Sequence, residues 1–321
     1  MAWSKVKGFL KSWTLIVAMG MGTAVYLAFA YVPPLEDVGR VCGAFLRAVF
    51  PVFMFLILFV TFCKVDFRQM RPHRWHLRVC VAQLVMVAAI IGAILLLFSR
   101  GTGKTLLESV LACVICPTAA AAAVITVKLG GEINSMTTYT LISNLMASVA
   151  IPVFLPLIEK EAGITFAEAL LTLLGEVLTV LVLPLLLAFI VRHYMPRLHA
   201  FITGVKDLGF YLWAVSLSVV TGITVSNLIH SPVSHWLLLA IASASLVTCL
   251  FQYSLGKLLG RGYGASVNSG QGLGQKNTVF AIWMASTYLN PVATLGPGCY
   301  ILWQNLFNGW QLSRMRGTGA K

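Results

Sequence analysis

The sequence has little charge and no polar stretch long enough to form a separate soluble domain. Only 10% of its 321 residues are charged, whereas soluble domains average about 25%. Hydrophobic residues make up 59% of the chain, and they recur from end to end. These values exclude a disordered chain and an ordinary soluble protein. Strand-like alternation over about ten residues is also missing, which argues against a membrane β-barrel.

Acidic residues are especially scarce. Lys and Arg total 23 against 10 Asp and Glu, a net charge of +13, and no carboxylate follows Asp207. In a soluble protein this excess would indicate nucleic acid. In a chain this apolar, we attribute it to cytoplasmic loops of a membrane protein, which are rich in Lys and Arg, and expect no nucleic-acid partner.

Motifs of catalysis and of resident metals are also missing. Cys113 and Cys116 form a CxxC pair, but no second pair or nearby histidine completes a zinc site. Neither HExxH nor Gly-x-Ser-x-Gly occurs. We therefore predict no enzyme and no cofactor.

Long apolar runs dominate what is present. A transmembrane helix needs about 20 apolar residues. The first run is followed by Pro33 and Pro34 rather than by a small-residue cleavage site, so we interpret it as a membrane helix and not as a signal peptide. The sequence predicts an all-α membrane protein in the lipid bilayer with ten transmembrane helices, at 12–32, 41–62, 77–98, 105–129, 134–157, 165–191, 204–228, 233–257, 265–288 and 291–312.

The basic residues divide unevenly between the two sides of this arrangement. With the N-terminus inside, 17 of the 23 Lys and Arg fall on the cytoplasmic side and 4 on the other, while Arg47 and Lys276 lie within spans. Five of the 17 belong to the connection 64–78. Because positive residues favour cytoplasmic loops, this division predicts that both termini are cytoplasmic.

Two of the ten segments carry helix-breaking residues. The fourth contains Pro117, and the ninth contains Gly272 and Gly274 among several amides. Each is the fourth span of a five-span half, which predicts inverted repeats at 1–162 and 163–321. Interrupted helices at matching positions of two halves indicate a transporter binding site near the middle of the membrane.

Short motifs near these breaks resemble the bile acid:sodium symporter family. They occur in the family's order, and the resemblance covers essentially the whole chain in span count. The motifs are Ala82-Gln83 in the third span, Cys116-Pro117 and the following Lys128-Leu129-Gly130-Gly131-Glu132, Gly274-Gln275-Lys276-Asn277 in the ninth span and Tyr300-Ile301-Leu302-Trp303-Gln304-Asn305 in the tenth.

The resemblance implies a fold, a substrate class and a location. Spans 1, 2, 6 and 7 would form a panel, spans 3–5 and 8–10 a core, and spans 4 and 9 would cross where each unwinds. Substrates would be organic anions such as bile acids, pantoate or other carboxylates, moved with sodium. The resemblance is to bacterial members, so we expect a multi-pass protein of the bacterial inner membrane. The sequence leaves the oligomeric state open.

Departures from the family pattern concern the sodium ligands. Ala122, Ala123 and Met136 stand at side-chain ligand positions of spans four and five, whereas Thr140 and Gln83 are kept. In span nine the family's glutamate falls at Gly272 and its glutamine at Lys276. A shift by one residue would instead pair Gln271 and Gln275 with these positions, and neither register restores a carboxylate.

We therefore predict that Lys276 replaces a sodium ion. Its ammonium would repel a nearby sodium ion in a medium of low dielectric constant. A buried lysine could also lose and regain a proton, so proton coupling and simple uniport both stay open. We expect Gln83, Thr140, Gln271, Gln275 and Lys276 to form the ion-replacing site. We expect the substrate to contact Thr118, Asn277, Thr278, Gln304 and Asn305.

Two other functions are possible from the sequence. The protein could be a conventional sodium-coupled symporter, or it could be a channel with a continuous polar pore. The polar residues gather at one depth around two breaks, which favours alternating access over a pore. Arg47 and Glu176 are two further charges within spans, and a structural ion pair is a better explanation for them than a substrate site.

Overall fold

A computed structural model of the chain describes residues 13–158, 167–168, 171, 174–175, 178–205, 207–231 and 233–318. Apart from one isolated β-bridge, the regular structure of these residues is helical. The helices are α2 (Thr14–Tyr31), α3 (Glu36–Cys63), α4 (Arg74–Leu97), α5 (Gly101–Ile115), α6 (Ala121–Lys128), α7 (Ile133–Phe154), α9 (Leu183–Tyr194), α10 (Pro196–Gly204), α11 (Leu208–Ile229), α12 (His235–Arg261), α13 (Ser266–Gly274), α14 (Thr278–Tyr288) and α15 (Leu295–Thr318).

Helices occupy most of the segments that the sequence predicts, and the all-helical class is confirmed. The fourth and ninth segments are each divided, into α5 and α6 and into α13 and α14. Of the sixth segment, 165–191, residues 167–168, 171, 174–175 and 178–191 are described, and they include the π-helical turn Leu178–Val182 and most of α9. Among the described residues, five helices are long and apolar enough to cross a membrane, namely α2, α4, α7 with the turn after it, α11 and α12. The count of ten spans and the two inverted repeats stay predictions.

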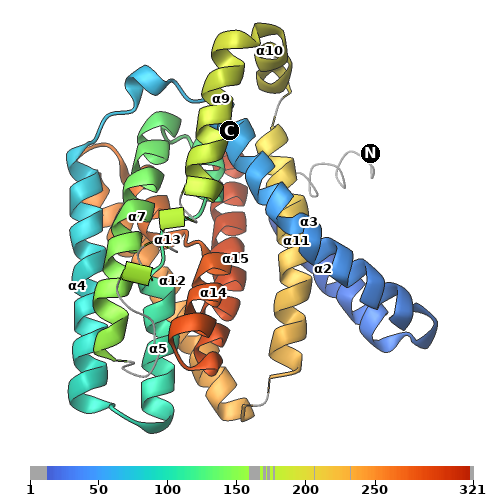
Figure 1. Cartoon of the computed structure of the whole chain (residues 1–321), viewed down its shortest axis with the longest axis vertical. Helices are drawn as coiled ribbons and strands as arrows, with labels where there is room; N and C mark the ends of the chain where they lie inside the picture. Colours follow the sequence, from blue (N-terminus) through green and yellow to red (C-terminus); the bar gives the residue numbers. More distant parts are fainter. Residues whose placement is uncertain are drawn as a thin grey trace.

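The helices form two groups (Figure 1). Contacts of α6 and α15 with α11 join the two groups. In one group α11 packs against α2 and α3, and α3 packs against α9. In the other, α12 packs against α13, α15 and α5, and α4 packs against α5 and α7. A Cβ atom on Gly22 of α2 would lie only 1.9 Å from the carbonyl oxygen of Ser218 on α11, so glycine is required for these two helices to approach this closely.

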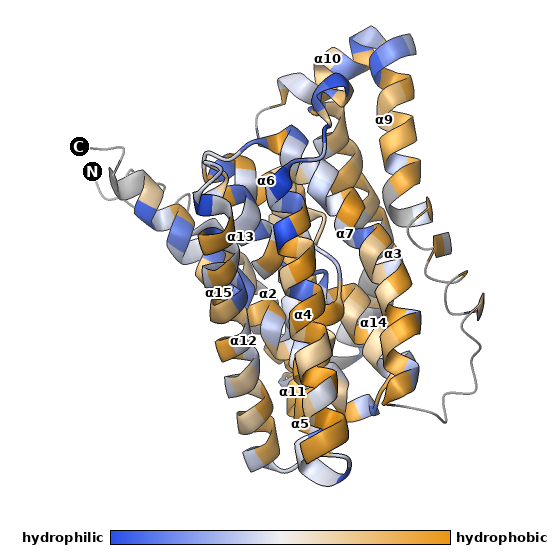
Figure 2. Cartoon of the chain, turned by 90° about the vertical axis from the view of Figure 1, so that its left-hand side faces the viewer, coloured by the Kyte–Doolittle hydropathy of each residue, from blue (hydrophilic) through white to orange (hydrophobic). Residues whose placement is uncertain are grey.

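The distribution of polar and apolar side chains is that of a membrane protein (Figure 2). On α4, for example, the side chains of Val85 and Leu96 are 61% and 84% exposed, whereas the amide of Gln83 is buried. In water such an apolar outer surface would drive association. In a bilayer the same surface contacts lipid, and the polar side chains face the protein interior.

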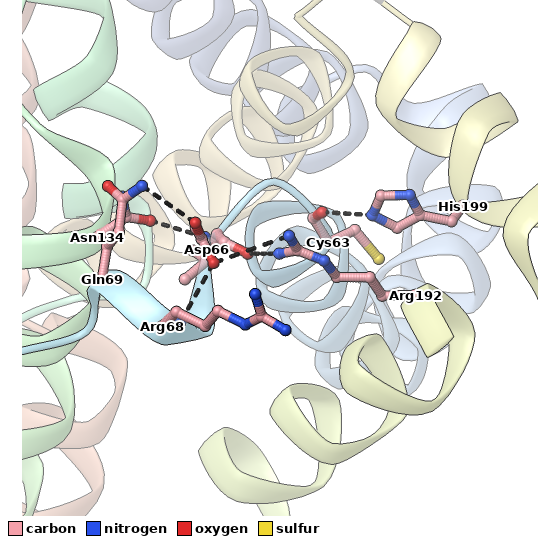
Figure 3. A network of polar contacts seen from close by, with 8 residues as sticks. Cys63, Asp66, Arg68, Gln69, Asn134, Arg192 and His199 are labelled. Atoms are coloured by element: carbon pink, nitrogen blue, oxygen red, sulfur yellow. Dashed lines mark hydrogen bonds and ion pairs between the residues drawn. The ribbon is translucent and has the colours of Figure 1, made fainter. Parts of the chain in front are cut away.

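One end of the molecule carries a polar network centred on Asp66 (Figure 3). The Asp66 carboxylate lies 3.8 Å from Arg192 of α9, and its backbone N–H donates to Asn134 Oδ1 of α7 at 2.8 Å. His199 of α10 donates to the carbonyl oxygen of Cys63 at the end of α3. The network therefore joins the end of α3 to α10, and it joins the connection 64–78 to α7 and α9. The sequence predicts that this connection is cytoplasmic.

Candidate transport site at a helix crossover

The first break follows directly from Pro117. Proline has no N–H to donate, and it disfavours a helical backbone in the residue before it. Cys116 is accordingly extended, with φ −65° and ψ 151°, and α5 ends at Ile115. Helical structure resumes at Ala121, the first residue of α6. The break lies where the sequence predicts it.

The second break lies just after the glycines rather than at them. Gly272 and Gly274 are both helical residues of α13, and the extended stretch comprises Gln275, Lys276 and Asn277. The glycines instead make room for aromatic rings. A Cβ atom on Gly272 would lie 2.8 Å from Tyr139, and one on Gly274 would lie 2.4 Å from Tyr253.

The two breaks cross and hydrogen-bond to each other. Ala119 N–H donates to the Gln275 carbonyl, and Asn277 N–H donates to the Pro117 carbonyl, both at 2.9 Å. This pairing forms an isolated antiparallel bridge between Thr118 and Lys276. Backbone groups that lose their helical partners are costly in a membrane unless they find others. Here each broken helix satisfies groups of the other.

Thr118 strengthens the crossover on the side facing α7. Its hydroxyl donates to the Gly272 carbonyl at 2.6 Å, and its backbone N–H donates to the Ser143 hydroxyl at 3.0 Å. Thr118 thus holds α13 and α7 together. It is not among the residues that line the cavity described below.

Lys276 is fully buried at the centre of the crossover. Its ammonium group donates to the carbonyl oxygens of Val114 and Cys116, each at 3.1 Å. These carbonyls belong to the last turn of α5, where the helix dipole places partial negative charge. Gln83 Nε2 donates to the same two oxygens, at 2.9 and 3.1 Å. Among the described residues, the groups that bond to this ammonium are neutral.

Gln304 fixes the backbone on either side of this lysine. Its Oε1 accepts from Lys276 N–H at 2.9 Å, and its Nε2 donates to the Lys276 carbonyl at 3.2 Å. Both peptide groups of Lys276 are therefore held by one side chain of α15. The Gln304 side-chain amide therefore stabilises the non-helical backbone at Lys276.

A small cavity of about 50 Å³ adjoins the crossover on the side facing α11. Four of the five predicted substrate residues line it, namely Asn277, Thr278, Gln304 and Asn305. The first turns of α6 and α14 also reach it, and helix N-termini attract anions. One water needs roughly 10–15 Å³ on this scale, so the space holds about three to five water-sized groups. A carboxylate group is of this size.

Asn305 presents an unsatisfied acceptor in this region. Its Nδ2 donates to the Ile301 carbonyl at 2.7 Å, whereas its buried Oδ1 has no hydrogen-bond partner within the described part of the chain. Buried polar atoms are rarely left without a partner, and each such case requires an explanation. A hydrogen-bond donor on a bound molecule would satisfy this atom.

The positions that resemble sodium ligands lack the oxygen atoms a sodium ion needs. Ala122, Ala123 and Met136 are buried together in an apolar cluster. No room exists for a side chain at Gly272, because the Tyr139 ring occupies the neighbouring space. The Thr140 hydroxyl donates to the Met136 carbonyl within α7. The residues present therefore do not fit a carboxylate-containing sodium site.

The remaining ion-site candidates lie on the opposite face of α13. Gln271 and Gln275 both hydrogen-bond to Asn308 of α15, at 2.9 Å each. Their side-chain bonds thus run to α15, and Gln275 is also among the residues that line the cavity beside the crossover. The predicted pairing of Arg47 with Glu176 falls on side chains that lie outside the described residues.

Several residues at the crossover are not identified from the sequence. Ser143, Tyr139 and Asn308 contact the breaks only because distant helices are brought together, and no local pattern marks them. Glu108 of α5 is a fully buried carboxylate, 3.4 Å from Lys104. It precedes Cys116 by eight residues, about 12 Å along a helix, and so does not supply an acidic ligand at the break.

Comparison with protein families identifies the chain's relatives. The sodium bile acid symporter family matches residues 51–231, more than half of the sequence. The chain belongs to the sodium bile acid symporter family. It is therefore a multi-pass membrane protein of a transporter family rather than an enzyme family. No curated protein matches the chain significantly.

Proposed function

We propose that this family member carries an organic carboxylate by alternating access, and that Lys276 takes the place of a sodium ion. The observation that carries the proposal is the shell of the Lys276 ammonium, which within the described part of the chain consists of the carbonyls of Val114 and Cys116 and no carboxylate. The substrate would be an anion such as a bile acid or a pantoate-like metabolite.

The cavity beside the crossover supports an anionic substrate. Asn277 Oδ1 caps α14 by accepting from Phe280 N–H, which leaves its Nδ2 for a ligand. This amide, the Thr278 hydroxyl and the first turns of α6 and α14 offer donors for a carboxylate. The unsatisfied Oδ1 of Asn305 would accept from a hydroxyl of the same molecule. Small hydroxycarboxylates combine these two features.

Electrostatics supports the replacement of sodium. Two unit charges 4 Å apart repel by about 4 kcal/mol at an effective dielectric constant of about 20. A sodium ion close to Lys276 would meet this repulsion without a neighbouring carboxylate to offset it. The family's name favours a conventional sodium symporter as a second candidate. The ligand positions Ala122, Ala123 and Gly272 argue against it.

Counterflow in liposomes tests the transport function. Purified protein is reconstituted with one unlabelled carboxylate inside, and uptake of its labelled form is followed for a panel of hydroxylated and unhydroxylated carboxylates. We expect saturable, slow counterflow for a hydroxycarboxylate. Flux that neither saturates nor shows counterflow would indicate a channel and overturn the proposal. A pH-gradient arm separates a permanently charged Lys276 from one that loses and regains its proton.

The membrane topology is part of the same proposal. It has ten spans in inverted repeats at 1–162 and 163–321, with a panel and a core, in the bacterial inner membrane and with cytoplasmic termini. The variant Arg71→Cys places an exposed thiol in the connection 64–78. We expect an impermeant thiol reagent to label it in inside-out vesicles only. Labelling from the outside of intact cells would contradict the orientation.

A further inference from the structure

We propose that Asn308 is a positioning residue that holds the second break in place through neutral hydrogen bonds, so that the crossover stays assembled without a bound cation. The inference rests on the proposed function, because it assumes that the crossover is the transport site. It concerns the face of α13 opposite Tyr139 and Thr118.

Asn308 lies at the centre of a buried polar network between α12, α13 and α15. Its side chain is fully buried. Its Oδ1 accepts from Gln271 Nε2 at 2.9 Å and from Tyr253 OH at 3.3 Å, and its Nδ2 donates to Gln275 Oε1 at 2.9 Å. Asn308 therefore bonds to two residues of the broken helix, one turn apart, and to one residue of α12.

The network reaches the break through Gln275. The side chain of Gln275 is held by Asn308, and its carbonyl accepts from Ala119 N–H of the other break at 2.9 Å. Gln275 is also the residue directly before Lys276. Independently of Asn308, Tyr300 OH donates to the Gly274 carbonyl at 2.7 Å. Asn308 thus acts on the crossover through one intervening residue.

The members that contact the break are uncharged. They are amides and phenols, which supply donors and acceptors in matched pairs. Lys257 enters the network only at its far end, where its ammonium donates to Gln311 Oε1, and Gln311 Nε2 lies 3.4 Å from Asn308 Oδ1. Buried amides are costly unless they are paired. A paired amide network can therefore hold α13 and α15 together without a bound ion.

The thiol of Cys116 reports whether the crossover is intact. Cys116 is completely buried at the first break, next to the Pro117 carbonyl that accepts from Asn277. The experiment measures alkylation of the purified protein by N-ethylmaleimide, with each cysteine resolved by peptide mass spectrometry. Cys63, which is buried in α3, is the internal reference. We expect Asn308→Ala to raise the Cys116 rate at least about tenfold relative to Cys63, because several hydrogen bonds are lost together.

A control variant removes comparable bonds from the other end of the same helix. Asn268 accepts from Glu132 N–H at 3.0 Å and donates to the Glu132 carbonyl at 2.6 Å. Asn268→Ala should lower thermal stability as much as Asn308→Ala but leave Cys116 protected. The conservative variant Asn308→Asp should also protect Cys116, because the Gln275 amide can rotate and donate to the new carboxylate. If Asn308→Ala does not fold, Gln275→Ala removes one arm and should expose Cys116 selectively.

The outcomes separate this inference from the proposed function. An unchanged Cys116 rate in Asn308→Ala overturns the role of Asn308 and leaves the transport proposal standing. The role of Asn308 is also overturned if the alkylation rates of Cys116 and Cys63 rise together in Asn308→Ala, or if the Cys116 rate rises equally in Asn268→Ala. The wild-type rate should be the same in sodium and potassium at equal ionic strength. Protection of Cys116 by sodium would overturn both proposals.

Discussion

Cations are held in two different ways in this molecule. At one end of the helices, Arg192 faces Asp66 and Lys128 faces Asp207, and these four side chains are 21–40% exposed. At the crossover, Lys276 is completely buried, and the atoms that its ammonium contacts are backbone carbonyl oxygens. Carboxylates pair with cations at the solvated end and are missing at the buried site.

The difference has an electrostatic consequence. A carboxylate beside Lys276 would neutralise it, and the desolvation of a buried ion pair often outweighs the attraction between its members. Carbonyl oxygens at the end of α5 stabilise the cation through their dipoles but leave its net charge in place. In the proposed mechanism, a substrate anion pairs with this uncompensated positive charge. The exposed pairs contribute little to stability by comparison.

The largest effect is expected from removing the buried cation. Lys276→Ala should lower the transport rate by about 100-fold, because two hydrogen bonds to a charged group are lost. Sodium should not restore it, and Lys276→Gln should be nearly as damaging. The matched control Lys128→Ala breaks the partly exposed pair with Asp207 and should change the rate by less than about twofold. Rates are measured by counterflow with one carboxylate probe. Equal losses in both variants would contradict the special role of the buried Lys276.

Gly272, which stands at the position of the family's glutamate, should not tolerate a larger residue. Gly272→Ala places a methyl group against Tyr139, and overpacking of this kind costs about 1–3 kcal/mol. Thermal unfolding in detergent measures the loss, and Gly272→Ala should cost much less in a Tyr139→Ala background than in the unmutated protein. Gly92→Ala on α4 is the control, because its new methyl group would meet no neighbouring side chain within 4 Å. If Gly272→Ala is as stable as Gly92→Ala, a glutamate could be accommodated after all.

Substrate contacts should have intermediate effects. Asn305→Ala removes the unsatisfied Oδ1 and should weaken the apparent affinity for a transported hydroxycarboxylate about tenfold, the value of one hydrogen bond or slightly more. Asn277→Ala should weaken it further, because the cap of α14 is lost as well. Concentration dependence of counterflow gives the affinity. Unchanged affinity in both variants would exclude the cavity as the substrate site.

The smallest effect is expected at the solvated network. Asp66→Asn removes the charge that faces Arg192 but keeps the oxygen that accepts from Arg68 N–H. Exposed pairs are worth about 0–1 kcal/mol, so thermal stability should fall slightly at low salt and not at high salt. A loss as large as that of Gly272→Ala would show that the two regions are not as different as their exposure indicates.

Sequence patterns locate the apolar helices and the break at Pro117, because composition and a missing N–H act locally. They misplace the second break by a few residues, because a glycine in a membrane span can either interrupt the helix or make room for a neighbouring side chain. Gly272 and Gly274 admit the rings of Tyr139 and Tyr253 and stay helical. Which rings approach them depends on the packing of α7 and α12, which no local pattern contains.

The candidate site was also predictable only in part, because some of its contacts depend on how distant helices pack. Gln83 and Lys276 are adjacent in the fold, as the family resemblance implies, because both donate to the end of α5. Gln271 and Gln275 were expected to face the same site, but their bonds to Asn308 point to the opposite face of α13. Residues one turn apart share a helix face, so the spacing groups Gln271 with Gln275. Which neighbouring helix that face meets depends on packing that the spacing does not contain.

The most direct test of the central claim is the initial rate of carboxylate uptake by the unmutated protein in liposomes. Sodium and potassium are compared outside the vesicles at equal ionic strength, with the membrane potential clamped. A buried Lys276 that replaces the ion predicts the same rate in both salts. A steep requirement for sodium would contradict it and make the protein a conventional sodium symporter.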